Sequence, residues 1–149
     1  MPSSDAARPV VVGVDDSPGS VAALRFALRE AALRGALLRV VHAWTVPALG
    51  EAAGMVPLLL DDLRREEHAV LDRAIEQATD GGRPDVDLQR VLVEDPPGRA
   101  LIEAAHDAQL VVVGSRGRGG FAGLLLGSVS QQVAHHAPCP VVIVPATGQ

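Results

Sequence analysis

Two short segments near the C-terminus contain residue types that bind phosphate. Gly114-Ser115-Arg116-Gly117 is followed by nine residues and then by Gly127-Ser128. Because glycine accepts positive φ and has no Cβ, consecutive backbone N–H groups in such segments can point at one oxygen-rich ligand. We therefore expect phosphate oxygens to be held by backbone amides and hydroxyl groups, the amides being those of Gly114, Gly117, Gly127 and Ser128 and the hydroxyls those of Ser128 and Ser130.

The flanking sequence places these glycines between a strand and a helix. Val111 to Val113 is an apolar run typical of a buried parallel strand, and residues 129–137 indicate a short helix. Helix N-termini favour anions because their first amides lack partners and the helix dipole is positive there. Ser128 is expected to cap this helix, with Gln131 completing a capping box.

Carboxylates follow another apolar run. Residues 10–14 predict the first strand, and Asp15 and Asp16 stand at its end. Asp15 is either a ligand contact at the sheet edge or an ordinary turn or capping aspartate. Asp16 is either solvated or capping, or it helps to hold a metal ion bound to the phosphates. Arg116 and Arg118 either clamp a terminal phosphate or remain solvated.

Composition excludes several kinds of chemistry. The 149-residue chain has no lysine and no tyrosine. A Walker-type P-loop and Schiff-base catalysis both need a lysine, and phenol-based acid catalysis needs a tyrosine. The formal net charge of −5 argues against a general nucleic-acid binder. With 48% hydrophobic but only 2% aromatic residues, the core must be built from Val, Leu, Ile and Ala.

Strand and helix signals alternate along the chain, which predicts an α/β fold with a parallel sheet and right-handed crossovers. Ser17-Pro18 predicts the start of the first helix and Gly35 its end. Thr45 to Pro57 predicts a loop that could cover a ligand. The expected strands are 10–14, 37–44, 87–93, 109–113 and 141–144, and the later helices run from Asp61 or Asp62 to near Gly81, over 97–106 and over 129–137.

The spacing Gly-x2-Gly-x9-Gly-Ser is similar to the nucleotide loop of universal stress proteins of the ATP-binding kind. Three further landmarks occur in the order found in that family, so the resemblance covers nearly the whole chain. They are an N-terminal strand with an acidic turn, the end of the second strand and a closing strand, at residues 10–18, 40–43 and 138–144.

The resemblance implies a fold and a place for the ligand. The fold is a three-layer, Rossmann-like sandwich of the adenine nucleotide alpha hydrolase-like kind, with a five-stranded parallel sheet of order 3-2-1-4-5. It implies one domain over residues 1–149, with an ordered core from about 8 to 146. Ligands of such sheets bind where the strand order reverses, here beyond the strands that end at 13–16 and 114–117.

The resemblance also implies roles for single residues. Asp15 matches an aspartate that contacts the base and sugar end of the nucleotide. Gly13, Val14, Ala43 and Val113 are expected to supply apolar walls and backbone hydrogen bonds for adenine. The full set of expected nucleotide contacts is Gly13, Val14, Asp15, Ala43, Val113, Gly114, Arg116, Gly117, Arg118, Gly127, Ser128, Val129 and Ser130.

We expect the ligand to be ATP, with Mg²⁺ or Mn²⁺, bound by a nucleotide-dependent regulator or sensor in a stress response. No positioned catalytic group is identifiable, so any hydrolysis should be slow. Two alternatives remain open. One is a slow ATPase or a nucleotidyl- or phosphoryl-transfer enzyme using the same cleft, and the other is a nucleotide-free module that works by protein contacts.

The remaining expectations concern partners and location. Val141 to Val144 is apolar and is expected at a sheet edge, either covered by its own domain or paired with a second chain in a homodimer, as in similar proteins. A further protein partner is unknown, and no membrane or nucleic-acid partner is expected. The single cysteine, Cys139, is expected to be a buried thiol and suits a cytoplasmic protein. His42 is expected to be a hydrogen-bonded strand-end histidine.

Overall fold

The described part of the chain contains a parallel sheet of five strands. The structure is a computed structural model that describes residues 8–46, 57–116 and 126–146. The strands are β1 (Val10–Gly13), β2 (Leu38–Trp44), β3 (Leu88–Glu94), β4 (Leu110–Gly114) and β5 (Val141–Val144). Their order, β3-β2-β1-β4-β5, confirms the expected topology, and each begins and ends within one residue of its expected bounds.

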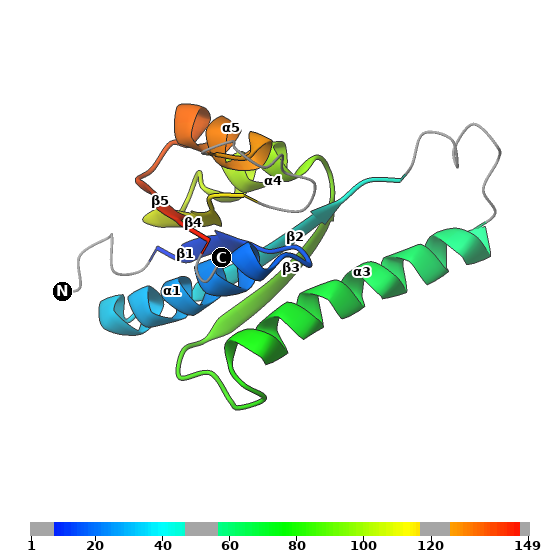
Figure 1. Cartoon of the computed structure of the whole chain (residues 1–149), viewed down its shortest axis with the longest axis horizontal. Helices are drawn as coiled ribbons and strands as arrows, with labels where there is room; N and C mark the ends of the chain where they lie inside the picture. The colour runs from blue at the N-terminus through cyan, green and yellow to red at the C-terminus, as the bar shows by residue number, and fades with distance from the viewer. Residues whose placement is uncertain (1–7, 47–56, 117–125, 147–149) are drawn as a thin grey trace.

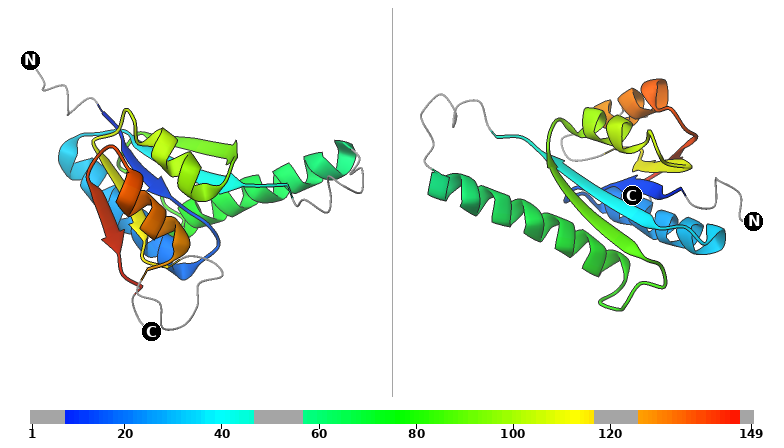
Figure 2. Two further views of the ribbon diagram at one scale, coloured as in Figure 1. Left: turned by 90° about the horizontal axis from the view of Figure 1, so that it is seen from above. Right: turned by 180° about the vertical axis from the view of Figure 1, so that it is seen from behind.

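Helices cover both faces of this sheet, which gives the expected three layers (Figures 1 and 2). On one face, α1 (Pro18–Arg34) and α3 (Pro57–Ala78) enclose a core with β1 and β2. On the other, α4 (Pro97–Ala104) and α5 (Ser128–His136) enclose a second core with β1 and β4. Valine, leucine and alanine fill both cores, as the shortage of aromatic residues requires.

Local signals at both ends determine α1. The Ser17 hydroxyl oxygen accepts from the Ser20 N–H at 3.2 Å, and Pro18 occupies the first helical position. At the other end Gly35 adopts φ 61°, a left-handed conformation that glycine takes without steric cost. Three alanines of α1 are fully buried where the helix packs against the sheet, namely Ala23, Ala27 and Ala31.

The start of α3 differs from the expectation. The helix begins at Pro57, before Asp61, because proline at the first position loses no hydrogen bond and already has a helical φ. Leu58 and Leu59 are 73% and 54% exposed, so these residues lack the inward-facing pattern that marks a helix in a sequence. The N-terminal end of α3 extends beyond the rest of the fold (Figure 1). Residues 47–56 of the expected loop lie outside the described residues.

Candidate functional site

The strand order reverses between β1 and β4. After β1 the chain enters α1 on one face of the sheet, and β4 is followed in the described chain by α5 on the other face. Because β1 and β4 are parallel neighbours, their carboxyl ends lie at the same edge. Ligands of open α/β sheets bind beyond such ends. The acidic turn and the start of the glycine segment are therefore brought to one place.

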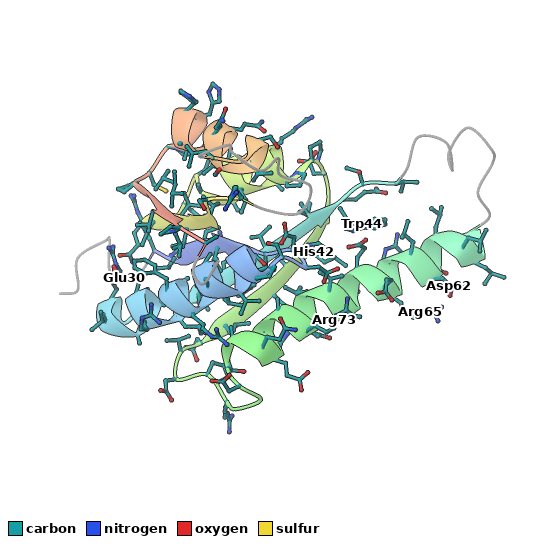
Figure 3. The ribbon with its side chains drawn as sticks, viewed as in Figure 1. Glu30, His42, Trp44, Asp62, Arg65 and Arg73 are labelled. Carbon is teal, nitrogen blue, oxygen red and sulfur yellow. The ribbon has the colours of Figure 1, made fainter. Side chains whose placement is uncertain are left out.

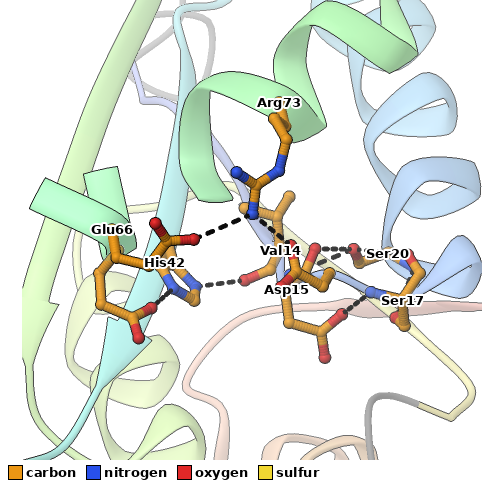
Figure 4. Close-up of polar contacts among 9 residues, drawn as sticks. Val14, Asp15, Ser17, Ser20, His42, Glu66 and Arg73 are labelled. Carbon is orange, nitrogen blue, oxygen red and sulfur yellow. Dashed lines mark hydrogen bonds and ion pairs between the residues drawn. The ribbon is translucent and has the colours of Figure 1, made fainter. Parts of the chain in front are cut away.

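Asp15 is held in a tight turn at this edge (Figure 4). Its carboxylate Oδ1 accepts from the Ser17 N–H at 2.7 Å. The Ser20 hydroxyl donates to the Asp15 carbonyl at 2.8 Å, and the Asp15 N–H lies 3.1 Å from the same hydroxyl oxygen. Ser20 is 6% exposed, so these bonds are shielded from water. This geometry is that of a turn aspartate, and contact between Asp15 and a ligand stays a prediction.

Asp16 faces α3. The guanidinium of Arg73 lies 3.4 Å from Asp16 and 3.7 Å from Glu66, so one arginine joins the acidic turn to the helix (Figure 4). Among the described residues no group of three or more histidine, cysteine, aspartate or glutamate side chains could hold a metal ion. In this structure Asp16 forms an ion pair while 41% of its side chain stays exposed, so it is partly solvated as expected, and a role in holding a metal ion with the phosphates stays a prediction.

Val14 is bonded within the protein at this edge. Its N–H donates to the Val41 carbonyl at 2.9 Å, and its carbonyl lies 2.9 Å from Nδ1 of His42. Its side chain is 6% exposed and belongs to the core beneath α1. Both backbone groups and the side chain of Val14 are thus engaged inside the protein, and contact between Val14 and a ligand stays a prediction.

Ala43 is better placed than Val14 to meet a base. Residues of a parallel strand point their N–H and C=O groups alternately to the two neighbouring strands. The Val41 carbonyl accepts from Val14, whereas the Trp44 carbonyl accepts from Asp95 on the β3 side at 3.0 Å. The N–H and C=O of Ala43 are thus directed to the β1 side, at a level where β1 has already ended. They form a donor and acceptor pair at the sheet edge.

Gly13 and Val113 lie on the face covered by α4 and α5. A Cβ on Gly13 would stand 2.6 Å from Cδ1 of Leu101 in α4, so the lack of a side chain at Gly13 leaves room for this leucine. Val113 is 3% exposed and packs in the same core. Val41 belongs to this core too, and Ala43 stands two positions after it in β2. The Ala43 side chain therefore lies on the same face of the sheet as Gly13 and Val113.

Gly114 is required by packing. A Cβ on Gly114 would stand 2.9 Å from the carbonyl oxygen of Gly19 in α1, and a Cβ on Gly19 would stand 2.8 Å from the carbonyl oxygen of Arg116. The backbone of the first turn of α1 thus touches the end of β4. Gly117 and Arg118, the next expected phosphate contacts, lie outside the described residues.

Ser115 joins the two glycine segments. Its carbonyl accepts from the Gly127 N–H at 2.6 Å and from the Ser130 hydroxyl at 2.9 Å. Ser130 is 2% exposed, and the same hydroxyl lies 3.0 Å from the Gly127 carbonyl. The expected role of Ser130 as a phosphate donor is not the role seen here, because its one hydroxyl proton is directed to backbone carbonyls. Ser130 instead fixes the entry to α5.

The start of α5 differs by one residue from the expectation. Gly127 is the N-cap, without a side-chain hydrogen bond, and Ser128 is already helical. The expected capping box is wrong, because the side-chain amide of Gln131 donates to the Leu126 carbonyl at 3.2 Å. Ser128 is exposed, and the amides of Ser128, Val129 and Ser130 belong to the first turn, whose N–H groups have no carbonyl within the helix. Such a turn can receive an anion.

The expectation for His42 is confirmed, and its partner Glu67 is not among the residues expected from the sequence. His42 is 1% exposed and bonds Val14 through Nδ1 and Glu67 through Nε2. His42 and Trp44 lie on the α3 side of β2 (Figure 3). Glu67 stands four residues after Leu63 and four before Leu71, so it lies on the inward-facing side of α3. A charged residue among apolar ones on that side is the sequence signal that indicates a buried polar partner.

The single cysteine of the chain lies away from this edge. Cys139 precedes β5 and is partly buried, and its sulfur lies 3.6 Å from the Pro140 carbonyl. Burial raises the pKa of the Cys139 thiol because the thiolate would be poorly solvated. The thiol is thus less buried than expected, and its raised pKa leaves less of the reactive thiolate near neutral pH.

Known proteins resemble this chain over nearly its whole length. The family model described as Universal stress protein family matches residues 6–145. Universal stress protein Rv2005c of Mycobacterium tuberculosis is 46% identical over 136 residues, which are 91% of this chain and 44% of that protein. This chain thus spans less than half the length of that relative.

Solved structures share the fold. A universal stress protein in complex with cAMP superimposes with a TM-score of 0.67 at 31% identity, covering 95% of this chain and 98% of the other. A universal stress protein from Archaeoglobus fulgidus in complex with dAMP gives a TM-score of 0.66 at 27% identity, covering 92% and 97%. Within the described ranges no helix is long and apolar enough to cross a membrane.

Proposed function

The chain belongs to the universal stress protein family, and from that premise we propose that it binds ATP and acts as a nucleotide-dependent regulator or sensor in a stress response. Two structural neighbours are complexes with adenine nucleotides, cAMP in one and dAMP in the other. They support an adenine nucleotide as the ligand class. The triphosphate and the regulatory role are our proposals.

The observation that carries the proposal is the meeting of three groups at the β1–β4 edge. The acidic turn at Asp15 is fixed by Ser17 and Ser20, Ala43 directs a donor and an acceptor past the end of β1, and α5 begins beside the end of β4. Adenine needs a paired donor and acceptor, ribose hydroxyls need an acceptor, and phosphates need N–H donors. This edge offers all three.

In the proposed complex adenine lies on the α4 and α5 face, against Ala43, Gly13 and Val113, and Asp15 accepts from the sugar. The phosphates lie at the first turn of α5, where the Ser128 hydroxyl is exposed. The amide of Gly117, together with Arg116 and Arg118, completes the phosphate contacts. The Gly127 amide, also expected to bind phosphate, instead donates to the Ser115 carbonyl. Mg²⁺ or Mn²⁺ accompanies the phosphates.

The regulator is preferred to an enzyme because the chain has no lysine for the β and γ phosphates and no identified base for an attacking water. Any ATP hydrolysis in this cleft is expected to be slow. The alternatives, a nucleotidyl- or phosphoryl-transfer enzyme and a nucleotide-free interaction module, are separated from the regulator by the experiment below.

We further propose one domain over residues 1–149, a cytoplasmic location, an unidentified protein partner and a homodimer formed through β5. β5 lies at one edge of the sheet, and its four residues are all partly exposed. An apolar edge strand has unpaired N–H and C=O groups that a second copy can satisfy.

The proposal is tested by identifying the nucleotide that the protein carries. Freshly purified protein is denatured and the released nucleotide is identified by chromatography and mass spectrometry, and the emptied protein is then titrated with ATP. The chain has one tryptophan, Trp44, which follows Ala43 and serves as an intrinsic fluorescent reporter. Near-stoichiometric ATP, or tight rebinding with negligible turnover, supports the regulator. Recovery of ADP or AMP with measurable turnover supports an enzyme, and absence of both nucleotide and binding leaves the interaction module.

A further inference from the structure

A groove on the surface lies between α1 and the connection from α3 to β3, which is the green turn at the lower left of Figure 1. Its volume is about 250 Å³. It is close to the start of β3, whereas the nucleotide is proposed to bind beyond the ends of β1 and β4. The groove and the proposed nucleotide site therefore lie at opposite edges of the parallel sheet. The lining residues are Leu28, Arg29, Ala32, Thr79, Arg83, Pro84, Asp85 and Val86.

Both walls of the groove are fixed to the rest of the fold. Leu28 of α1 and Val86 of the connection are partly buried and pack against the core beneath α1. The Arg25 guanidinium donates to the Gln77 carbonyl at 2.9 Å and lies 3.5 Å from the Asp80 carboxylate, so it ties the end of α3 to α1. The groove is thus formed before a ligand binds, which lowers the entropic cost of binding.

Two arginines line the groove without a carboxylate partner. Most other arginines of the described residues form ion pairs, as Arg34 does with Glu30 at 3.6 Å. Arg29 and Arg83 form none with any described residue. The guanidinium of Arg29 lies 6.0 Å from the centre of the Phe26 ring, a contact that orients it and leaves its N–H donors available. In a chain of formal net charge −5, two such groups beside one groove indicate a site for an anion.

A third charged residue restricts which anion fits. Asp85 also lines the groove, so the lining has two arginines and one aspartate and a formal charge of +1. A singly charged carboxylate balances that charge, whereas a doubly charged phosphate would be repelled by Asp85. The Thr79 hydroxyl donates to the Ile75 carbonyl at 2.8 Å, so the ligand must be held mainly by the guanidinium groups.

The remaining lining residues are apolar, namely Leu28, Ala32, Pro84 and Val86. They favour a ligand with a hydrocarbon part, because burial of apolar surface supplies binding free energy. Pockets for drug-sized ligands typically have volumes of about 300 to 1,000 Å³, so a groove of about 250 Å³ suits a smaller molecule.

We propose that this groove is a second binding site of the protein and that its ligand is a small aliphatic monocarboxylate. The guanidinium groups of Arg29 and Arg83 bind the carboxylate, and the hydrocarbon part packs against Leu28, Pro84 and Val86. The inference does not rest on nucleotide binding.

An aliphatic carboxylate occurs both in simple organic acids and in amino acids. Leucine and 4-methylpentanoate have the same branched hydrocarbon part and differ in the ammonium group of leucine. Asp85 can accept from that ammonium group. If leucine binds more tightly than 4-methylpentanoate and Asp85→Asn removes the difference, the ligand is an amino acid, and the opposite preference identifies a simple acid. Both results support a carboxylate site.

The test is a titration of the full chain with 4-methylpentanoate, followed by NMR through the methyl resonances of Leu28 and Val86. We expect saturable shifts with a dissociation constant on the order of 1 mM, which is typical of a ligand with so few atoms. The neutral 4-methylpentanamide and inorganic phosphate are the control ligands. Each should bind about tenfold more weakly, because the first lacks the charge and the second lacks the hydrocarbon part.

Arg29→Gln and Arg83→Gln should each weaken 4-methylpentanoate binding about three- to tenfold, the size of one charged hydrogen bond that is partly screened by water. Arg34→Gln is the matched control, since it removes the same charge from α1 at a residue outside the groove, and it should bind as wild type does. Ala32→Leu fills the groove without changing a charge and should abolish binding. Ala32 is exposed and leucine has a high helix propensity, so this variant keeps the fold.

The inference is overturned if wild type shows no saturable shift of these methyl resonances, or if phosphate or the amide binds as well as the carboxylate. It is also overturned if Arg34→Gln weakens binding as much as Arg29→Gln and Arg83→Gln do, or if Ala32→Leu binds as wild type does. None of these results changes the proposed function, because ATP binding is measured separately and at the opposite edge of the sheet.

Discussion

The carbonyl oxygen of Gly19 lies so close to Gly114 that a Cβ added to Gly114 would stand 2.9 Å from it. A Cβ on Gly19 would in turn stand 2.8 Å from the Arg116 carbonyl. Two backbones, one from the first turn of α1 and one from the end of β4, are thus in direct contact. This contact brings the acidic turn before α1 next to the segment expected to bind phosphate.

Gly114→Ala is therefore expected to lower the free energy of unfolding by about 1 to 3 kcal/mol, because one of the two backbones must move. Urea unfolding measures the loss. Gly82→Ala is the matched control, since a Cβ there would stand 3.2 Å from the Thr79 carbonyl on an exposed turn, and we expect a change within about 0.5 kcal/mol. Equal effects at the two positions would show that the close approach does not matter.

The ion pair between Arg39 and Asp107 predicts a loss of stability in acid. The Arg39 guanidinium donates to both carboxylate oxygens, at 2.8 and 3.3 Å, and this hydrogen bonding holds the pKa of Asp107 below its ordinary value. A carboxylate whose pKa is lower in the folded state stabilises the protein above its unfolded pKa of 3.8, and that contribution disappears as pH falls through the folded value.

Near neutral pH, Asp107→Asn should lower the free energy of unfolding by a few tenths to about 1 kcal/mol. The effect is small because the carboxylate is 66% exposed and screened by water. The difference from wild type should shrink toward zero as pH falls below 3.8. Urea unfolding at a series of pH values measures it. Glu103→Gln, an exposed carboxylate on α4, is the control. A difference that stays constant with pH would contradict an electrostatic origin.

The first helix shows how much local sequence can determine. Ser17, Pro18 and Gly35 each act through their own backbone or capping chemistry, so the bounds of α1 follow from residues that are neighbours in the chain. The strands could also be predicted from the sequence, because strands buried on both faces of a sheet, such as β4, are apolar runs. The strand order came from resemblance to a family, since no local signal specifies which strands pair.

Roles that depend on distant contacts could not be predicted. Gly114 fits a phosphate-binding pattern, yet its need for glycine is also explained by Gly19, and spacing cannot reveal a contact between segments so far apart. The sequence likewise suggested Ser130 as a ligand donor, whereas its hydroxyl is used by Ser115 and Gly127. The sequence shows which side chains can form hydrogen bonds, but the fold determines which partners they bond.

Ser130 and Ser128 are expected to respond differently to substitution. Ser130→Ala removes a buried donor from the carbonyls of Ser115 and Gly127, so the free energy of unfolding should fall by about 1 to 2 kcal/mol. Ser128 is exposed, and Ser128→Ala should change stability by no more than about 0.5 kcal/mol while weakening ATP binding several-fold. Chemical unfolding and ATP titration of both variants measure the two effects. Unchanged affinity in Ser128→Ala would remove that hydroxyl from the proposed phosphate site.

A substitution at the outer edge of β5 can test the proposed dimer without removing hydrogen bonds between β4 and β5. The N–H of Ser115 donates to the Val144 carbonyl and that of Val111 to the Pro140 carbonyl. By the alternation along a strand, Val142 also faces β4, and Val141 and Ile143 point their N–H and C=O groups outward. An outward N–H is what a second copy of β5 would bond.

Ile143→Pro removes one outward donor without removing a bond to β4, so it should shift the protein from dimer to monomer while the domain stays folded. Light scattering or sedimentation over a range of concentrations measures the state of assembly. Arg90→Pro is the control on the opposite edge, because the bond from Asp95 to Trp44 places 91 and 93 toward β2 and Arg90 outward. If Ile143→Pro still dimerises as wild type does, or if Arg90→Pro is the variant that dissociates, the dimer does not form through β5.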